Sequence, residues 1–131
     1  REVFDQPVIM MSAKDRHTAL ITKDGALWSW GKGKFGQLGH GGREPRWRPV
    51  RLGKEIFCGS PAVMVACGEE HTLVLTAAGL VWSCGSYGCG QLGVSDDDMA
   101  DRLMLTLVVA ARFKGEHIVM IAAGSQHSVA L

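Results

Sequence analysis

Short apolar runs of strand length, each followed by a polar turn, recur along this 131-residue chain. The runs lie at Val8–Met11, Val63–Ala66 and Ile118–Ala122. Each turn leads into a second apolar segment that begins with a histidine. These segments are His17–Ile21, His71–Leu75 and His127–Leu131. The pattern predicts pairs of short strands joined by tight turns, because no helical period runs through the segments.

A third strand is predicted after each complete pair. Gly25 and Gly79 close turns that join hairpin strands, since glycine readily adopts the positive φ that such turns need. The return strands are Ala26–Trp30 and Leu80–Cys84. The four prolines fall outside all of these strands, as ladder pairing requires. The apolar stretch 99–113 is ambiguous and fits either a strand or a helix.

The same residues return at nearly constant spacing. His71 follows His17 by 54 residues, and His127 follows His71 by 56. A Trp-Ser-x-Gly motif followed by Gly-Gln-Leu-Gly occurs twice, and we expect its tryptophans, Trp28 and Trp82, to fill the same core pocket in their repeats. The positions that form the structural signature are His17, Gly31, Gly36, Gln37, Leu38, Gly39, His71, Gly85, Gly90, Gln91, Leu92, Gly93 and His127. Such self-similarity indicates one supersecondary unit stacked on copies of itself.

This combination of motifs resembles the repeat of the regulator of chromosome condensation family. The resemblance covers nearly the whole chain, although Lys14 stands where a glycine is expected and Cys84 where a second tryptophan is expected. It implies an all-β fold, a partial β-propeller of a family with seven blades. We expect one such segment over 1–131, with repeat 1 at about 8–61, repeat 2 at about 62–117 and a partial repeat 3 at 118–131. The length is too short for a full ring of this period, so we interpret the chain as a piece of a larger propeller.

The amino-acid composition and net charge limit the functions and locations that this protein can have. The formal net charge of +1 predicts no bulk attraction to nucleic acid or to an anionic membrane. No apolar run reaches the roughly 18 residues that a membrane-spanning helix needs. The four cysteines form no metal-type CxxC pair and favour reduced thiols. We therefore expect an intracellular protein, nuclear or cytoplasmic, that binds neither membranes nor nucleic acid directly.

No catalytic or cofactor-binding constellation stands apart from the repeats. His17, His71 and His127 could form a zinc site, but they would also recur if every unit needs the same backbone hydrogen bond at its turn. We favour that structural role. The glycines of 31–36 are reminiscent of a phosphate-binding loop, yet no helix is predicted after them, so tight turns explain them better. We expect no catalytic residue, no metal and no cofactor.

One inter-strand loop differs in character between the two repeats. In repeat 1 the segment 43–54 carries five of the fourteen basic residues and a tryptophan, whereas its counterpart in repeat 2, 95–101, is acidic. Because the two loops occupy equivalent places, the fold does not dictate their charge. The candidate partner-binding residues are Arg43, Arg46, Trp47, Arg48 and Arg51. The alternative is a solvated loop whose arginines pair with nearby acidic residues.

These features predict a protein–protein interaction module rather than an enzyme. The resemblance implies a second option, a guanine nucleotide exchange factor for a Ran-like small GTPase, associated with chromatin. No residue here matches the wedge on which exchange in the founding member depends. We also expect self-association, because the strand edges at both ends of an incomplete ring stay open. Such contacts would bury Val119, Ile121, Val129 and Leu131, which are otherwise expected to face water.

Overall fold

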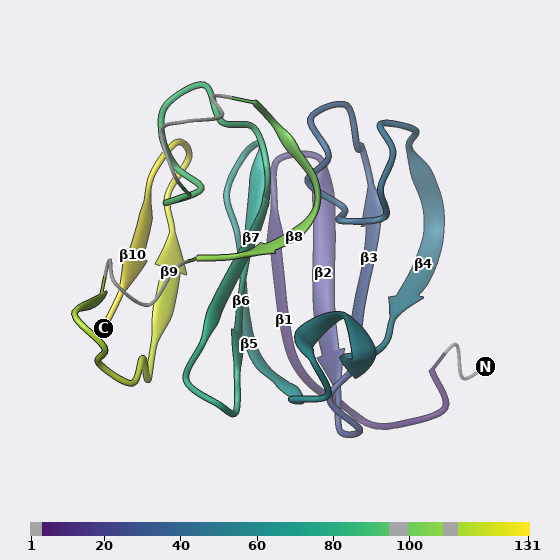
Figure 1. The fold of residues 1–131 in the computed structure, drawn as a ribbon. Helices are drawn as coiled ribbons and strands as arrows, with labels where there is room; N and C mark the ends of the chain where they lie inside the picture. Colours follow the sequence, from purple (N-terminus) through teal and green to yellow (C-terminus); the bar gives the residue numbers. More distant parts are fainter. Residues whose placement is uncertain (1–3, 95–99, 109–112) are drawn as a thin grey trace.

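The computed structural model describes residues 4–94, 100–108 and 113–131. Its strands form three antiparallel sheets that stand side by side, as Figure 1 shows. The first sheet contains β1 (Val8–Lys14), β2 (His17–Thr22), β3 (Leu27–Gly31) and β4 (Arg46–Leu52), hydrogen-bonded in that order. The second contains β5 (Ala62–Cys67), β6 (His71–Thr76), β7 (Val81–Gly85) and β8 (Arg102–Leu107). The third pairs β9 (Ile121–Ala123) with β10 (Ser128–Ala130).

The two four-stranded sheets are built in the same way, as the sequence repeat predicts. Gly25 and Gly79 adopt φ of 81° and 76° and close the β2–β3 and β6–β7 turns. Even the irregularities of strand pairing coincide. They fall between Val8 and Met10, between Ala62 and Met64, between Ser29 and Gly31, and between Ser83 and Gly85. The predicted all-β fold of repeated antiparallel sheets is therefore confirmed.

The ambiguous stretch 99–113 contains a strand. β8 spans Arg102–Leu107 and pairs with β7, while residues 99 and 109–112 lie outside the described residues. A short 3-10 helix, η1 (Lys54–Phe57), links the first sheet to the second, and Cys58 ends it with a φ of 55°. No helix in the described part of the chain is long and apolar enough to cross a membrane.

Two predicted boundaries need correction. Segment 43–54 is not simply a loop, because β4 begins at Arg46 and pairs with β3 as the last strand of the first sheet. In the third sheet the regular strand starts at Ile121 rather than Ile118. There the N–H groups of Val119 and Met120 both donate to the Leu131 carbonyl, at 2.7 and 3.1 Å, so one carbonyl serves two donors and regular pairing begins only afterwards.

Apolar side chains fill the spaces between neighbouring sheets. β1 and β2 pack against β5, and β5 and β6 pack against β9. The first core lies between the first and second sheets and includes Ile21, Phe57, Val74, Trp82 and Cys84. The second core, beside the third sheet, includes Leu73, Leu75, Val81, Ile118 and Ile121.

The third sheet, which has two strands in the described residues, leaves several of its apolar side chains exposed. The prediction that Ile121 faces water is wrong, because it packs in the second core and is 6% exposed. Val119, Val129 and Leu131 are exposed, as expected. The end of the molecule that carries β9 and β10 therefore keeps several apolar side chains in solvent.

Candidate functional site

A histidine of repeat 1, a hydroxyl of repeat 2 and a backbone carbonyl connect the first two sheets; we call this the first bridge. His17 Nε2 lies 2.8 Å from Thr72 Oγ1, and that hydroxyl donates to the Gln37 carbonyl over 2.7 Å. A hydroxyl has one proton, and here the carbonyl receives it, so the bond to the ring must be donated by Nε2–H. The His17 ring is 2% exposed, which makes this a buried contact between repeats.

The second repeat forms an equivalent second bridge. His71 Nε2 lies 3.0 Å from Ser128 Oγ, which donates to the Gln91 carbonyl over 2.6 Å. The two histidines therefore make the same bond, but its partner is a hydroxyl on the following repeat, whereas a backbone group was expected. The sequence signal for it is the Ser or Thr that directly follows each repeated histidine.

Burial keeps both bridging rings neutral. Desolvation lowers the pKa of His17 to about 4 and also lowers the pKa of His71. Nδ1 of each ring is buried and has no hydrogen-bond partner among the described residues. Among residues 4–94, 100–108 and 113–131, no group of three His, Cys, Asp or Glu side chains could hold a metal ion. The bridges thus work by hydrogen bonding between neutral groups.

The Gly-Gln-Leu-Gly residues shape the loop that presents the bridging carbonyl. In repeat 1, Gln37 Oε1 accepts from the Phe35 N–H at 3.0 Å, and Ser29 Oγ donates to the Leu38 carbonyl at 2.7 Å. Repeat 2 makes the same bonds in the pairs Gln91–Cys89 and Ser83–Leu92, both at 2.8 Å. The signature glycines of both loops have positive φ, which glycine adopts with little strain. The motif therefore builds a fixed loop, and its glutamine acts on the loop itself.

A repeated phenylalanine, which the motif search missed, supports the tryptophan of the third strand. Phe57 meets Trp82 edge to face with ring centroids 5.7 Å apart, and Phe4 meets Trp28 in the same manner at 5.1 Å. Phe113 is the third member of the series and packs on the second core. The signal was present in the sequence as phenylalanines at 4, 57 and 113, close to the repeat period. Trp82 is buried, whereas Trp28 is half-buried, so the two tryptophans do not fill equally enclosed pockets.

Two of the candidate partner-binding arginines are engaged within the chain. Arg43 bonds Asp101 at 3.0 Å and the Lys34 carbonyl at 2.8 Å. Arg51 forms an ion pair with Asp24, also at 3.0 Å. Each of these two arginines therefore pairs with a nearby acidic residue, as the alternative of a solvated loop describes. Most of the acidic counterpart segment, 95–99, lies outside the described residues.

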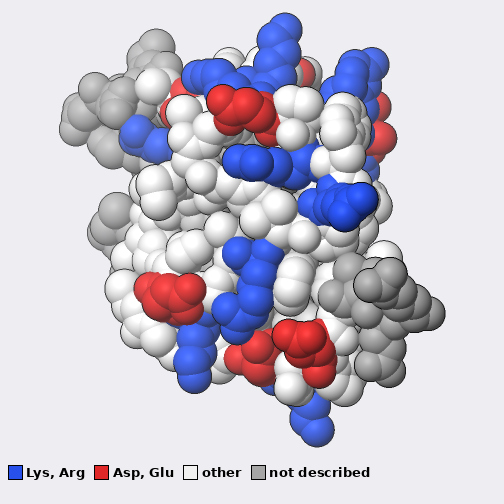
Figure 2. Space-filling model, turned by 90° about the vertical axis from the view of Figure 1, so that its right-hand side faces the viewer, with Lys and Arg blue, Asp and Glu red and all other residues white. Residues whose placement is uncertain are grey.

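The remaining three candidates form a surface that we call the basic strand. Arg46, Trp47 and Arg48 are consecutive on β4 and all exposed, with Trp47 71% exposed. Figure 2 views the molecule from the β4 side and shows Lys and Arg gathered over the upper part of this face, with fewer acidic side chains among them. The structure thus brings basic groups and one large apolar group together at the surface.

A polar cavity of about 390 Å³ lies between the first two repeats. It is formed by the β1–β2 turn, the loop after β3 and the β5–β6 turn. Its charged lining residues are Asp15, Arg16, Lys32, Lys34, Glu69 and Glu70. Repeat 1 contributes all of the basic side chains and the acidic Asp15, whereas repeat 2 contributes only acidic side chains. The lining of the polar cavity therefore shows the same difference in charge between the two repeats as their inter-strand segments do.

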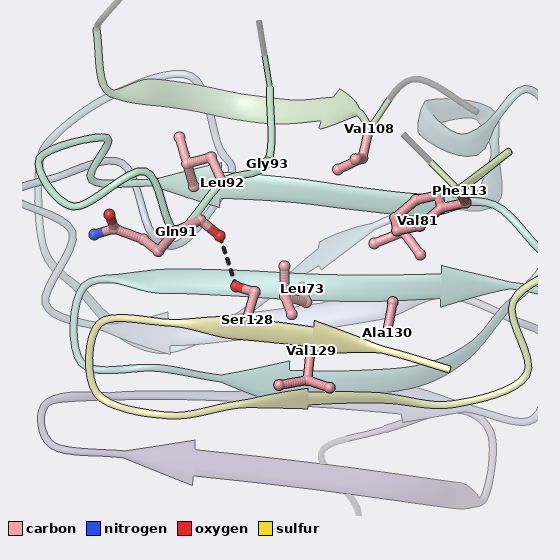
Figure 3. A pocket seen from close by; sticks show the side chains of 10 residues that line it. All are labelled: Leu73, Val81, Gln91, Leu92, Gly93, Val108, Phe113, Ser128, Val129 and Ala130. Atoms are coloured by element: carbon pink, nitrogen blue, oxygen red, sulfur yellow. Dashed lines mark hydrogen bonds between the residues drawn. The ribbon is translucent and has the colours of Figure 1, made fainter. Parts of the chain in front are cut away.

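An apolar cavity of about 110 Å³ lies between the second sheet and the third. Figure 3 shows Leu73, Val81, Leu92 and Val108 directed toward the space beside β10, and the Ser128–Gln91 bond at its rim. The lining is mostly apolar and supplies few polar groups to orient a small ligand. The cavity is thus a packing site rather than a catalytic one.

Two family models match the chain, and both are described as the regulator of chromosome condensation (RCC1) repeat. One matches residues 24–75, and the other matches residues 8–37 and 63–91. The chain is 47% identical over 83 residues to an X-linked retinitis pigmentosa GTPase regulator homolog from Caenorhabditis elegans, which covers 62% of this chain and 6% of that protein. It is 33% identical over 126 residues to the probable E3 ubiquitin-protein ligase HERC3 from Homo sapiens, which covers 95% of this chain and 11% of that protein.

A solved structure shares the arrangement of sheets. The chain matches Prp20p from Saccharomyces cerevisiae with a TM-score of 0.81 and 27% identity, over 95% of this chain and 31% of that one. Prp20p is described as binding Gsp1p and histones. The chain therefore spans less than a third of each of these relatives.

Proposed function

This chain belongs to the regulator of chromosome condensation repeat family, and from that premise we propose that it is a protein–protein interaction module. The propeller sheets provide a rigid support, and surface side chains that the fold does not require are free to bind a partner. We assign partner binding to the basic strand, centred on Arg46 and Arg48. Arg43 and Arg51 hold the two ends of this surface through their pairs with Asp101 and Asp24.

The observation that carries this proposal is a difference in charge between matched strands. Gly31 pairs with Arg46 as Gly85 pairs with Arg102, so β4 and β8 can be compared position by position. Arg48 then corresponds to Met104, and both side chains face solvent. A fold that accepts methionine at this position does not need arginine there. The charge of Arg48 is therefore available for binding an acidic partner.

The loops beside the basic strand differ in the same direction. Arg16, Lys32 and Lys34 line the polar cavity in repeat 1. At the corresponding positions repeat 2 has Glu70, Ser86 and Gly88. Positive charge on repeat 1 thus extends from the outer strand to the neighbouring turns. Such a one-sided arrangement favours an acidic protein surface as the partner and makes the association sensitive to salt.

The test is a charge reversal in the full chain. Wild type and the double variant Arg46→Glu, Arg48→Glu are used to capture proteins from nuclear and cytoplasmic extracts at low and high salt, and bound proteins are identified by mass spectrometry. We expect the variant to lose partners that high salt also removes from the wild type. The same partners retained by the variant would place the binding surface elsewhere.

A matched control separates the local surface from overall charge. Lys23 and Lys114 are exposed lysines outside β4, so Lys23→Glu with Lys114→Glu changes the net charge equally. We expect this control to keep the salt-sensitive partners. Thermal unfolding of both double variants should match that of the wild type, because exposed charges contribute little to stability.

Nucleotide exchange on a Ran-like small GTPase, on chromatin, is the second candidate function. It is supported by the likeness to Prp20p, which is described as binding Gsp1p and histones. Release of labelled GDP from such a GTPase, measured with and without this chain, tests it directly. Acceleration of release would establish exchange, and an unchanged rate together with partner capture would leave the interaction module as the function.

The proposal also covers the chemistry of the described residues and the cellular location of the protein. We assign no catalytic residue, cofactor or metal to the described residues, and no direct contact with membranes or nucleic acid. All four cysteines are free thiols, which supports an intracellular location, nuclear or cytoplasmic. Fractionation of cells that express the tagged full-length protein would test the location.

A further inference from the structure

The polar cavity lies wholly within the first two repeats. Its walls come from the β1–β2 turn, the loop after β3 and the β5–β6 turn, so every lining residue falls between positions 15 and 70. Its volume of about 390 Å³ lies in the range of about 300–1,000 Å³ that is typical of ligand sites. Because most of its lining is charged, the arrangement of these charges decides which ligand the cavity accepts.

Backbone hydrogen bonds fix both walls of the polar cavity. The Lys32 N–H donates to the Arg16 carbonyl over 2.8 Å, which joins the loop after β3 to the β1–β2 turn. On the wall formed by repeat 2, the Ser86 N–H donates to the Glu70 carbonyl, also over 2.8 Å. A site whose backbone is already held in this way loses little conformational freedom when a ligand binds.

The charged side chains of the two walls do not neutralise one another. Repeat 1 contributes Lys32 and Lys34, and repeat 2 contributes Glu69 and Glu70. Within the described part of the chain, none of these four side chains forms an ion pair. The third basic side chain, that of Arg16, pairs instead with the adjacent aspartate at 3.4 Å. Two lysines and two glutamates of the cavity therefore keep charges that a ligand can pair with.

The opposite charges of the walls disfavour a ligand of single charge. An anion attracted by the two lysines would meet the carboxylates of Glu69 and Glu70, and a cation attracted by these carboxylates would meet the lysines. A free amino acid carries both charges on one carbon atom, whereas the charged groups of the walls lie too far apart to pair. Residues i and i+2 of an extended peptide lie on one face, about 7 Å apart. A peptide with opposite charges at these positions therefore suits both walls.

The side chain of Gln37 gives the cavity a polar group that suits a peptide backbone. It lines the cavity and is 4% exposed. Its Oε1 accepts from the Phe35 N–H over 3.0 Å, so the amide is oriented and Nε2 is the donor end. Nε2 has no acceptor among the described residues and can donate to a carbonyl of a bound peptide. The half-buried ring of Phe35 adds apolar surface to the same wall.

We propose that the polar cavity binds an extended segment of a partner protein in which an acidic and a basic residue stand two positions apart. The acidic side chain pairs with Lys32 and Lys34, and the basic side chain pairs with Glu69 and Glu70. Gln37 donates to the peptide backbone between them. This site goes beyond the basic strand, because it selects a sequence that carries both charges, and it does not rest on that surface.

Titration of the ¹⁵N-labelled full chain with three short peptides, followed by NMR, tests the proposal. The peptides are blocked at both ends and carry Asp-Gly-Lys, Asp-Gly-Asp or Lys-Gly-Lys between flanking glycines and serines. We expect the Asp-Gly-Lys peptide to bind at least about tenfold more tightly than the other two. It should shift the amide signals of residues 15–16, 32–37 and 69–70. No binding of this peptide, equal binding of all three, or shifts confined to other parts of the chain would overturn the proposal.

Reversal of one wall should change which peptide is preferred. In the variant Lys32→Glu, Lys34→Glu both walls are acidic, so the Lys-Gly-Lys peptide should become the tightest binder. In Glu69→Lys, Glu70→Lys the preference should move to the Asp-Gly-Asp peptide. Loss of the fold cannot produce such gains in binding. A preference for Asp-Gly-Lys that survives both reversals would show that the peptide binds elsewhere.

Two controls separate the cavity from other charges. The variant Lys23→Glu, Lys114→Glu changes the net charge as much as the lysine reversal does, but neither residue lines the cavity. We expect the order of the three peptides to stay that of the wild type, and a changed order would mean that overall charge selects them. The variant Arg46→Glu, Arg48→Glu should also keep this order, so a failure of the basic strand can be told apart from a failure of the cavity.

Discussion

The two interfaces within this chain follow one plan to different degrees of completion. Between the first and second sheets, Trp82 and Cys84 are buried, and the first bridge is fully enclosed. Between the second sheet and the third, the second bridge forms, yet a cavity of about 110 Å³ remains and Val129 is exposed. The polar bridge is thus present at both interfaces, although the apolar packing differs between them. At the first interface all four strands of the following repeat also contribute apolar side chains to the core.

Truncation of the two repeated tryptophans should give the largest difference in stability between equivalent positions of the two repeats. Trp82→Ala should lower the free energy of unfolding by about 3–5 kcal/mol, because it empties the first core beside Phe57. Trp28→Ala should cost clearly less, because Trp28 is half-buried and packs on Phe4. Urea unfolding of both variants measures the difference. Equal losses would mean that the two tryptophans share the same degree of enclosure in solution.

Acid should weaken the molecule through the buried histidines. Because burial lowers the folded-state pKa of His17 to about 4, the unfolded chain binds a proton near pH 6.5 that the folded chain does not take up. The free energy of unfolding should therefore fall as the pH drops from about 6.5 to about 4, by on the order of 3 kcal/mol for this residue. His71 adds to the fall, since burial lowers its pKa as well.

Histidine variants assign this pH dependence to the bridge. His17→Gln should reduce the slope of unfolding free energy against pH over that range, whatever its effect on stability at neutral pH. His127→Gln serves as the control, because His127 is the repeated histidine whose side chain is exposed. An unchanged slope in His17→Gln would show that His17 is not the group that titrates.

The reactivity of the cysteines should show the difference between buried and exposed parts of the molecule without any substitution. Cys84 is buried in the first core, whereas Cys89 is exposed beside Gly90. Burial also raises the pKa of Cys67 to about 11 and raises that of Cys84, which suppresses their reactive thiolates. In the folded chain a thiol reagent should modify Cys58 and Cys89 rapidly and the other two only after unfolding. Rapid modification of Cys84 in the native protein would show that the first interface opens.

The repeat in the sequence was sufficient to predict the sheets, because glycine at positive φ and strand-length apolar runs are local signals. It did not predict the bridge partner, since Thr72 is close to His17 only after two sheets have packed. Nor did it predict where β4 begins, because Pro49 and several arginines conceal a strand that exists through pairing with β3. The missed phenylalanines fall in the same class. Their spacing was visible, but the role of Phe4 and Phe57 depends on the tryptophan that each of these two meets.

A double-mutant cycle across the first bridge tests the account most directly. His17→Gln and Thr72→Val are measured singly and together by urea unfolding, beside the equivalent cycle of His71→Gln and Ser128→Ala. We expect a coupling energy of about 1 kcal/mol or more for the buried first bridge, and a smaller positive value for the half-buried second one. Additive effects within about 0.3 kcal/mol in both cycles would show that the bridges do not join the repeats.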